Sequence, residues 1–123
     1  MAFVKQFEDL RAWQEARILN RQIYQLTVEG AFAKDFGLRD QIRRAAVSGM
    51  TNIAEGFDCD SKVEFARFLG IARRSVVEVQ SLLYTVVDAG YITEQTRLSH
   101  HGQAAKVKGL IGALKHSMTK PKT

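Results

Sequence analysis

The fold is decided by residues 61–90, which read SKVEFARFLGIARRSVVEVQSLLYTVVDAG. The apolar residues of this stretch recur at steps of four and three, which is the repeat of one buried face of a helix. The repeat predicts a helix over residues 62–89 with a heptad-like seam, as in an antiparallel bundle. Ser61 and Glu64 match the capping box that begins a helix, and Gly90 is a typical C-terminal stop. The seam consists of Phe65, Leu69, Ala72, Val76, Val79, Leu83 and Val86.

Three further segments carry helical periodicity: residues 8–28, 38–57 and 94–118. None of the chain alternates apolar and polar residues as a half-buried strand does. Four amphipathic helices joined by short turns predict an all-α fold, an antiparallel up-down-up-down four-helix bundle. We expect this single domain to span residues 1–118, followed by a disordered basic tail at residues 119–123.

The ends and buried faces of these helices follow from the same pattern. Gly30 is expected to end the first helix in the left-handed conformation, before a connector at residues 31–36. Thr93 is expected to cap the last helix. The expected buried residues are Ala12, Ala16, Leu19, Ile23 and Leu26 in the first segment, Leu38, Ile42, Ala45, Gly49, Ile53 and Phe57 in the second, and Leu98, Ala104, Val107, Ile111, Leu114 and Met118 in the last.

Composition limits the class of protein. The 123 residues are 46% hydrophobic and 25% charged, which is typical of one folded globular domain. A single cysteine, Cys59, excludes an internal disulfide and favours a reducing compartment. No apolar stretch approaches the roughly 20 residues of a membrane-spanning helix, and the N-terminus lacks the apolar core of a signal peptide. We therefore expect a cytoplasmic protein without a membrane role.

Positive charge is concentrated at the C-terminal end. Residues 1–94 carry 12 Lys/Arg and 13 Asp/Glu, whereas residues 95–123 carry six Lys/Arg and no acid, which together give the net charge of +5. Such a segment favours a polyanion or an acidic partner surface. Taken alone, however, the charge fits better with a solvated helix face that continues into a basic tail.

Residue patterns for catalysis or metal binding are missing from the sequence. A di-iron bundle needs a Glu-x-x-His spacing, which no histidine here has. His100, His101 and His116 have no cysteine or acidic companion at ligand spacing. There is no glycine-rich phosphate loop or nucleophile elbow, and Cys59 lies between two aspartates that disfavour its thiolate. We expect no catalytic residue, no metal and no other cofactor.

Asn52 and Glu55 lie three residues apart and so share one side of the second helix. One interpretation makes them ligands for a small polar molecule. The other, which we favour, has both side chains bond backbone groups at the turn that follows the helix.

Nine cationic residues are candidates for nucleic-acid binding. Arginine forks suit phosphate oxygens, but they equally suit salt bridges with Asp40, Glu64 and Glu78 inside the bundle. In the last helix, Lys106 and Lys108 flank the buried stripe on opposite sides, and no acid of that helix beyond Glu94 offers them an ion pair. The nine candidates are Arg39, Arg43, Arg44, Arg67, Arg73, Arg74, Lys106, Lys108 and Lys115.

Several motifs, in order, resemble those of a known family. The most specific is residues 52–56, Asn-Ile-Ala-Glu-Gly, and Gly90-Tyr91 precedes the last helix as it does in that family. The chain departs from the family pattern at Met50 and Ala33, where a proline is usual. The other matching stretches are Phe7-Glu8-Asp9-Leu10 with Trp13 and Ala16, Phe36-Gly37-Leu38, Gln41-Ile42-Arg43-Arg44-Ala45-Ala46, and Ser61-Lys62-x-Glu64-Phe65-x-Arg67-Phe68-Leu69.

The family is that of the four-helix bundle proteins of 23S rRNA intervening sequences, which includes accessory variability proteins of diversity-generating retroelements. The resemblance implies a small bacterial protein that assembles as a ring-shaped homopentamer. It further implies a non-enzymatic protein that binds RNA or DNA or assists a reverse transcriptase, with Asn52, Glu55, Gly56, Ser61 and Glu64 in structural roles. The alternative is a protein-binding scaffold with no nucleic-acid role. Apolar residues outside the helical stripes are expected to form the subunit interface, for example Ile18, Phe32, Ile71 and Leu110.

Overall fold

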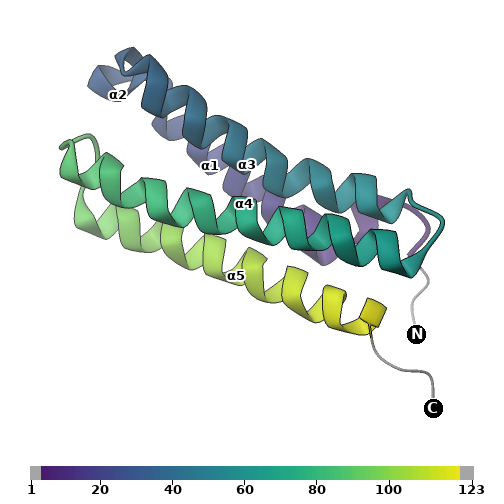
Figure 1. The fold of residues 1–123 in the computed structure, drawn as a ribbon. Coiled ribbons are helices and arrows are strands. Elements are labelled where there is room, and N and C mark those ends of the chain that lie inside the picture. The colour runs from purple at the N-terminus through teal and green to yellow at the C-terminus, as the bar shows by residue number, and fades with distance from the viewer. Residues whose placement is uncertain (1–3, 120–123) are drawn as a thin grey trace.

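The computed structural model describes residues 4–119, which are entirely helical apart from short connections (Figure 1). A short 3-10 helix, η1, precedes the first of four long helices, and a five-residue helix, α2, lies between the first two. No strand occurs in this part of the chain. The elements are η1 (Phe7–Asp9), α1 (Arg11–Leu26), α2 (Gly30–Lys34), α3 (Phe36–Phe57), α4 (Lys62–Asp88) and α5 (Glu94–Thr119).

The four long helices form an antiparallel bundle. Each of α1 and α4 packs against both α3 and α5, so the helices follow the order α1, α3, α4, α5 around the core. Successive long helices run in opposite directions, and α1 begins at the end of the bundle where α5 ends (Figure 1). The predicted all-α, up-down-up-down bundle is confirmed. None of the described helices is long and apolar enough to cross a membrane.

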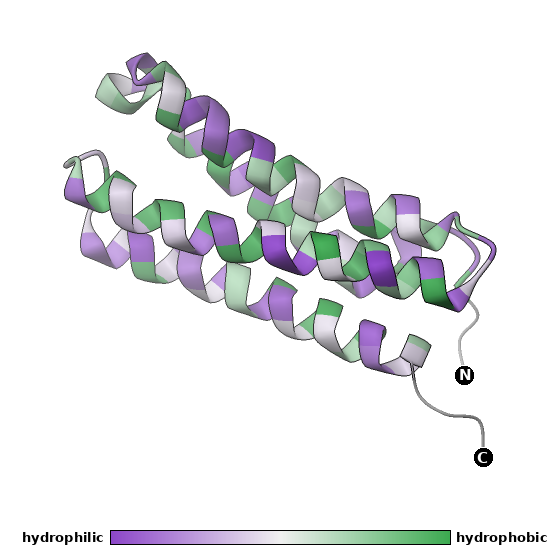
Figure 2. Ribbon diagram, in the orientation of Figure 1, coloured by the Kyte–Doolittle hydropathy of each residue, from purple (hydrophilic) through white to green (hydrophobic). Residues whose placement is uncertain are grey.

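The core lies along the predicted stripes. All seven seam residues of α4 are buried, as the spacing predicts. Figure 2 shows the corresponding alternation of hydrophobic and hydrophilic segments along the long helices. Gly49 lets α3 and α4 approach closely, because a Cβ at this position would lie only 3.0 Å from Cγ2 of Val76 in α4. The stripe residues at the helix ends are only half-buried, namely Leu26, Leu38, Phe57, Leu114 and Met118.

Side chains and glycine cap the helices largely as expected. The Ser61 hydroxyl accepts a hydrogen bond from the Glu64 N–H at 3.1 Å, but the Glu64 carboxylate bonds Arg67 instead of reaching back, so half of the capping box forms. Gly90 has φ +80°, and its N–H reaches the carbonyl of Val87 in a left-handed cap that ends α4. In the same way as Ser61, Thr93 caps α5 through the N–H of Thr96.

The connector between the first two long helices differs from the prediction. Gly30 has the expected positive φ of +66°, but it begins α2, whereas α1 ends four residues earlier at Leu26. Thr27 follows α1, and its hydroxyl donates back to the carbonyls of the last turn. Asp35 then caps α3 by accepting the Leu38 N–H, which moves the start of that helix to Phe36.

The buried face of α5 also differs at its beginning. Leu98 was expected in the core but is 56% exposed, and Arg97 is buried in its place with 6% exposed. The reason is helical phase, because Arg97 lies a full heptad before buried Ala104 whereas Leu98 lies six residues before it. At the other end, Thr119 belongs to α5 rather than to a tail, and residues 120–123 lie outside the described part of the chain.

The apolar residues expected at a subunit interface are not the exposed ones. Phe32 is buried and stacks on Tyr91, with ring centroids 5.2 Å apart, so it belongs to the core. Ile18, Ile71 and Leu110 are half-buried. The large apolar residues that are exposed are Val4, Tyr24, Val28, Phe36, Val63, Val77, Tyr84 and Leu98.

Candidate nucleic-acid interface

The Asn52 side chain links α3 to α4. Its amide donates to the carbonyl and the hydroxyl of Ser48, at 2.9 and 3.0 Å. The Ser48 hydroxyl in turn contacts the Ser75 hydroxyl of α4 at 2.8 Å. Asn52 therefore bonds a backbone group of the preceding turn, not of the turn that follows, and the network crosses the α3–α4 contact.

Of the other residues of the Asn-Ile-Ala-Glu-Gly motif, Glu55 lies on the surface and Gly56 lies in the contact between α3 and α4. Glu55 is exposed, and within residues 4–119 its carboxylate makes no hydrogen bond, so the expected bond to the backbone is absent there. Gly56 is buried where α3 meets α4, because a Cβ would lie 2.8 Å from the Phe68 Cβ and 2.9 Å from the Phe65 Cδ1. The motif glycine is thus required by the packing of these helices.

Three of the nine candidate cations form ion pairs within the bundle. Arg39 pairs with Asp40 at 2.9 Å, and its guanidinium lies over the Phe36 ring. Arg67 pairs with Glu64, also at 2.9 Å. The salt-bridge interpretation therefore holds for these two arginines. Glu78, the third acid expected to pair with an arginine, instead accepts a hydrogen bond from Gln41. The third ion-paired cation is Lys106.

Lys106 faces α1, where its charge is compensated. Its Nζ lies 3.1 Å from Oε1 of Glu15, a carboxylate that also accepts a hydrogen bond from the Gln103 amide at 3.1 Å. The hydrogen bond from Gln103, and then that from Lys106, lower the pKa of Glu15 below its ordinary value. The hypothesis that Lys106 is free for a polyanion is therefore wrong.

Arg43 has no acidic partner among the described residues and is held instead by Thr27, which follows the end of α1. Its Nε donates to the Thr27 hydroxyl at 2.7 Å and one terminal nitrogen donates to the Thr27 carbonyl at 3.2 Å. The guanidinium also covers the ring of Tyr24, 4.5 Å from its centroid. These contacts secure the end of α1 to α3 and occupy the arginine fork that a phosphate would need.

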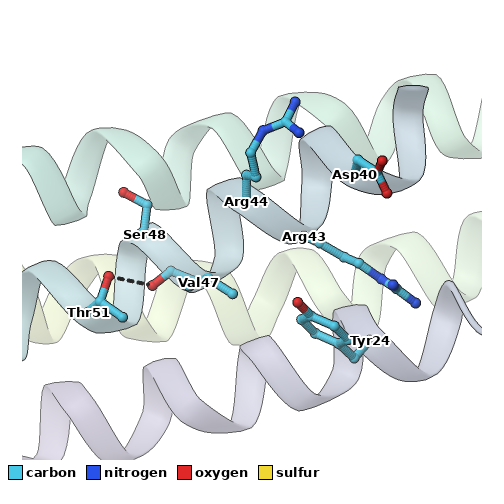
Figure 3. A pocket seen from close by; sticks show the side chains of 7 residues that line it. All are labelled: Tyr24, Asp40, Arg43, Arg44, Val47, Ser48 and Thr51. Carbon is cyan, nitrogen blue, oxygen red and sulfur yellow. Dashed lines mark hydrogen bonds between the residues drawn. The ribbon is translucent and has the colours of Figure 1, made fainter. Parts of the chain in front are cut away.

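Arg44 and Arg43 border a shallow groove on the outer side of α3 (Figure 3). The groove has a volume of about 660 Å³. Figure 3 shows Arg43 extending over Tyr24 of α1 while Arg44 points away from it, so the two guanidinium groups do not converge on one ligand. Its lining residues are Tyr24, Asp40, Arg43, Arg44, Val47, Ser48 and Thr51.

Three of the remaining cations lie along the line where α4 and α5 pack together. The Nζ of Lys115 lies 3.3 Å from the position of a Cβ on Gly70, so Lys115 extends over α4. Lys108 lies two turns earlier on the same side of α5. Arg73 lies one heptad before Gln80, whose amide contacts His101 of α5, and therefore faces α5 as well. We call Arg73, Lys108 and Lys115 the α4–α5 cationic strip.

Within the described residues, no carboxylate pairs with any member of this strip. The same is true of Arg44 and Arg74, which lie on the outer sides of α3 and α4. Among the described residues, six of the nine candidates thus have no carboxylate partner; Arg43 is held by Thr27, and three of the other five form the α4–α5 cationic strip.

A polar cluster that the sequence did not predict lies where α4 and α5 pack together, beyond the end of this strip. Arg97 is buried, donates two hydrogen bonds to Glu94, and lies over the Tyr84 ring at 4.2 Å from its centroid. Its hydrogen bonds lower the pKa of Glu94 below the ordinary value. The edge of the His101 ring contacts Tyr84, with centroids 6.5 Å apart. The burial of Arg97 could have been predicted from its heptad spacing to Ala104, a residue expected in the core.

The histidines do not form a metal centre in the part of the chain that the structure covers. His100 bonds the carbonyl of Thr96 at 2.9 Å, and His116 is exposed. No three His, Cys, Asp or Glu side chains among residues 4–119 gather as metal ligands would.

The fold and the site define a small antiparallel four-helix bundle with the α4–α5 cationic strip on one side. The chain belongs to the family described as 23S rRNA-intervening sequence protein, whose sequence pattern matches residues 8–113. A solved structure with the same fold is that of a protein of unknown function from the S23 ribosomal protein family of Bacteroides thetaiotaomicron. It is 21% identical, with a TM-score of 0.77 over 85% of this chain and 94% of the other. No curated protein matches the chain.

Proposed function

We propose that this protein is a non-enzymatic, oligomeric nucleic-acid-binding protein that contacts phosphates through the α4–α5 cationic strip. The observation that carries the proposal is the division of the candidate cations. Lys106, on the α1 side of α5, is paired with Glu15. Lys108 and Lys115, on the α4 side, face no carboxylate among the described residues. A row of cations without acidic partners is suited to binding a phosphate backbone.

The proposal extends to the assembly and its partners. We propose a bacterial, cytoplasmic homopentamer that assists a reverse transcriptase, which is what the likeness to retroelement accessory proteins implies. Membership of the family supports this, as do half-exposed apolar side chains such as Val77 and Leu98, which would be covered in an assembly. In a ring every cation recurs in each subunit, so weak phosphate contacts add through multivalency.

Salt-dependent binding tests the proposal. We expect the wild-type protein to bind mixed-sequence RNA or DNA, with log affinity falling by about 0.7–0.9 per log salt for each phosphate contacted. The double variant Lys108→Gln/Lys115→Gln should bind more weakly and show a flatter salt slope. The matched control is Lys106→Gln, which removes a lysine of the same helix whose charge Glu15 already compensates. Fluorescence anisotropy at several salt concentrations measures both quantities.

Two results contradict the proposal in different ways. A wild-type protein that ignores nucleic acid even at low salt supports the protein-binding scaffold, which then needs an acidic protein partner for its basic side. Equal losses in the Lys106 variant and in the double variant show that phosphates are not bound at the strip. Circular dichroism of each variant checks that the bundle remains folded.

A further inference from the structure

We infer that the α4–α5 cationic strip binds nucleic acid as a single strand, with one unpaired base stacked on Tyr84. This inference rests on the proposed function and adds to it the form of the ligand and the residue that recognises it.

The α4–α5 side has a cationic end and an aromatic end. Gly70, Val77 and Tyr84 lie at heptad spacing on α4, and therefore on one side of that helix. Lys115 extends over Gly70 at one end, and Arg97 lies against Tyr84 at the other. At 1.5 Å per residue, the distance from Gly70 to Tyr84 is about 21 Å, which is room for a few nucleotides.

The ring of Tyr84 is positioned so that a nucleic-acid base can stack on it. Half of its surface is exposed, although it lies beside a buried cluster. The guanidinium of Arg97 lies over the ring at 4.2 Å from the centroid, and the His101 ring packs against it in a T-shaped arrangement. Because Arg97 is itself bonded to Glu94, the ring is held in place before any ligand arrives. A fixed, exposed aromatic ring beside a row of cations is the arrangement that binds single strands.

Two buried polar atoms beside the ring have unused hydrogen-bonding capacity. Nη1 of Arg97 and Nδ1 of His101 have no partner among the described residues. Gln80 contacts Nε2 of His101 with its amide nitrogen, and when Nε2 accepts that hydrogen bond, Nδ1 carries the ring proton. Both unpartnered atoms are then donors. A nucleotide brings the acceptors that these donors lack, in its phosphate and base oxygens.

A second tyrosine provides the comparison. Tyr24 is 39% exposed and is also covered by an arginine, since the guanidinium of Arg43 lies 4.5 Å from its centroid. It lies on α1, however, in the groove that contains the Asp40 carboxylate. Tyr24 therefore lies away from the α4–α5 cationic strip, whereas Tyr84 lies at heptad spacing from Gly70, over which Lys115 of the strip extends. We therefore assign the stacked base to Tyr84 and not to Tyr24.

Substitution of each tyrosine tests the assignment. Anisotropy compares a mixed-sequence single-stranded oligonucleotide with the duplex of the same sequence for wild type, Tyr84→Leu, Tyr84→Phe and Tyr24→Leu. We expect tighter binding of the single strand by wild type and a loss of about tenfold in its affinity for Tyr84→Leu. The salt slope and the duplex affinity of this variant should not change, because no cation is removed. Tyr84→Phe keeps the ring and should bind like wild type, as should Tyr24→Leu.

The other outcomes separate this inference from the proposed function. If wild type binds with salt dependence but Tyr84→Leu binds the single strand equally well, the stacking assignment is wrong and the proposed function stands. Preference for the duplex, or a loss confined to Tyr24→Leu, likewise overturns the inference alone. Absence of any binding by wild type at low salt overturns both.

Discussion

Gly56 shows at the scale of one residue why the Asn-Ile-Ala-Glu-Gly motif ends in glycine. The residue is helical and needs no unusual backbone angle, since the only positive φ values among the described residues belong to Gly30 and Gly90. What excludes a side chain is space, because Phe65 and Phe68 of α4 lie within 3 Å of a would-be Cβ. The glycine of the motif is therefore explained by the close packing of α3 and α4, not by a ligand site.

Gly56→Ala should lower the stability of the protein. The added methyl group must displace the Cβ of Phe68, which is attached to the α4 backbone and cannot move away alone, and overpacking of this kind costs about 1–3 kcal/mol. Gly109→Ala is the matched control: this exposed α5 glycine has open space around its Cβ position, so alanine should add about 0.5–1 kcal/mol through helix propensity. Urea unfolding of both variants measures the two changes, and equal effects would refute the steric explanation.

At the scale of elements, a polar clasp joins the first and last helices. Glu15 of α1 accepts hydrogen bonds from Gln103 and Lys106 of α5, and the Gln103 amide also reaches the Glu15 carbonyl. These contacts fix the register of two helices that are far apart in the sequence. They also explain why the two sides of α5 differ in charge, since only the α1 side offers a carboxylate.

The clasp makes stability dependent on pH in the acid range. Because the folded protein lowers the pKa of Glu15, the carboxylate stabilises the fold fully above its ordinary pKa of 4.5, and this contribution is lost as the pH falls through the lowered value. Glu15→Gln should therefore melt below wild type at pH 7, with a difference that shrinks below about pH 4.5. Thermal melts from pH 3 to 7 measure this. Glu29→Gln, a change at an exposed glutamate whose side chain caps nothing, serves as the control and should show no such trend.

At the scale of the whole molecule, charge is divided between the two sides of the bundle. The α1 side carries the Lys106–Glu15 pair and the held Arg43, whereas the α4–α5 side carries the cationic strip and the half-exposed ring of Tyr84. In an assembly of identical subunits the strip would recur at regular intervals and present a longer cationic surface to a strand.

Light scattering coupled to gel filtration checks the proposed assembly. We expect a particle of about five chains at micromolar concentration, each of 13.8 kDa. A particle of another size above one chain would contradict the pentamer and leave an oligomer, and a single chain of 13.8 kDa would contradict both. Nucleic-acid affinity that rises with protein concentration as the assembly forms would connect the particle to its function.

The sequence by itself determined the order of the helices, their antiparallel connection and most of the core. Short turns between amphipathic segments leave few topologies, and the spacing of four and three identified every buried seam residue of α4. The helix caps at Ser61 and Thr93 could also be predicted from the sequence, because each side chain accepts a hydrogen bond from an N–H only three residues away.

The tertiary structure alone decided which charges remain available. Lys106 and Lys108 look equivalent in the sequence, and only the packing of α1 beside α5 brings Glu15 to the first of them. It also decided that Arg97, whose burial the heptad spacing to Ala104 indicates, lies against Tyr84, since that contact depends on how α5 packs beside α4. The physical reason is that periodicity is a local property of one helix, whereas charge compensation and side-chain stacking depend on which residue of a distant helix lies opposite.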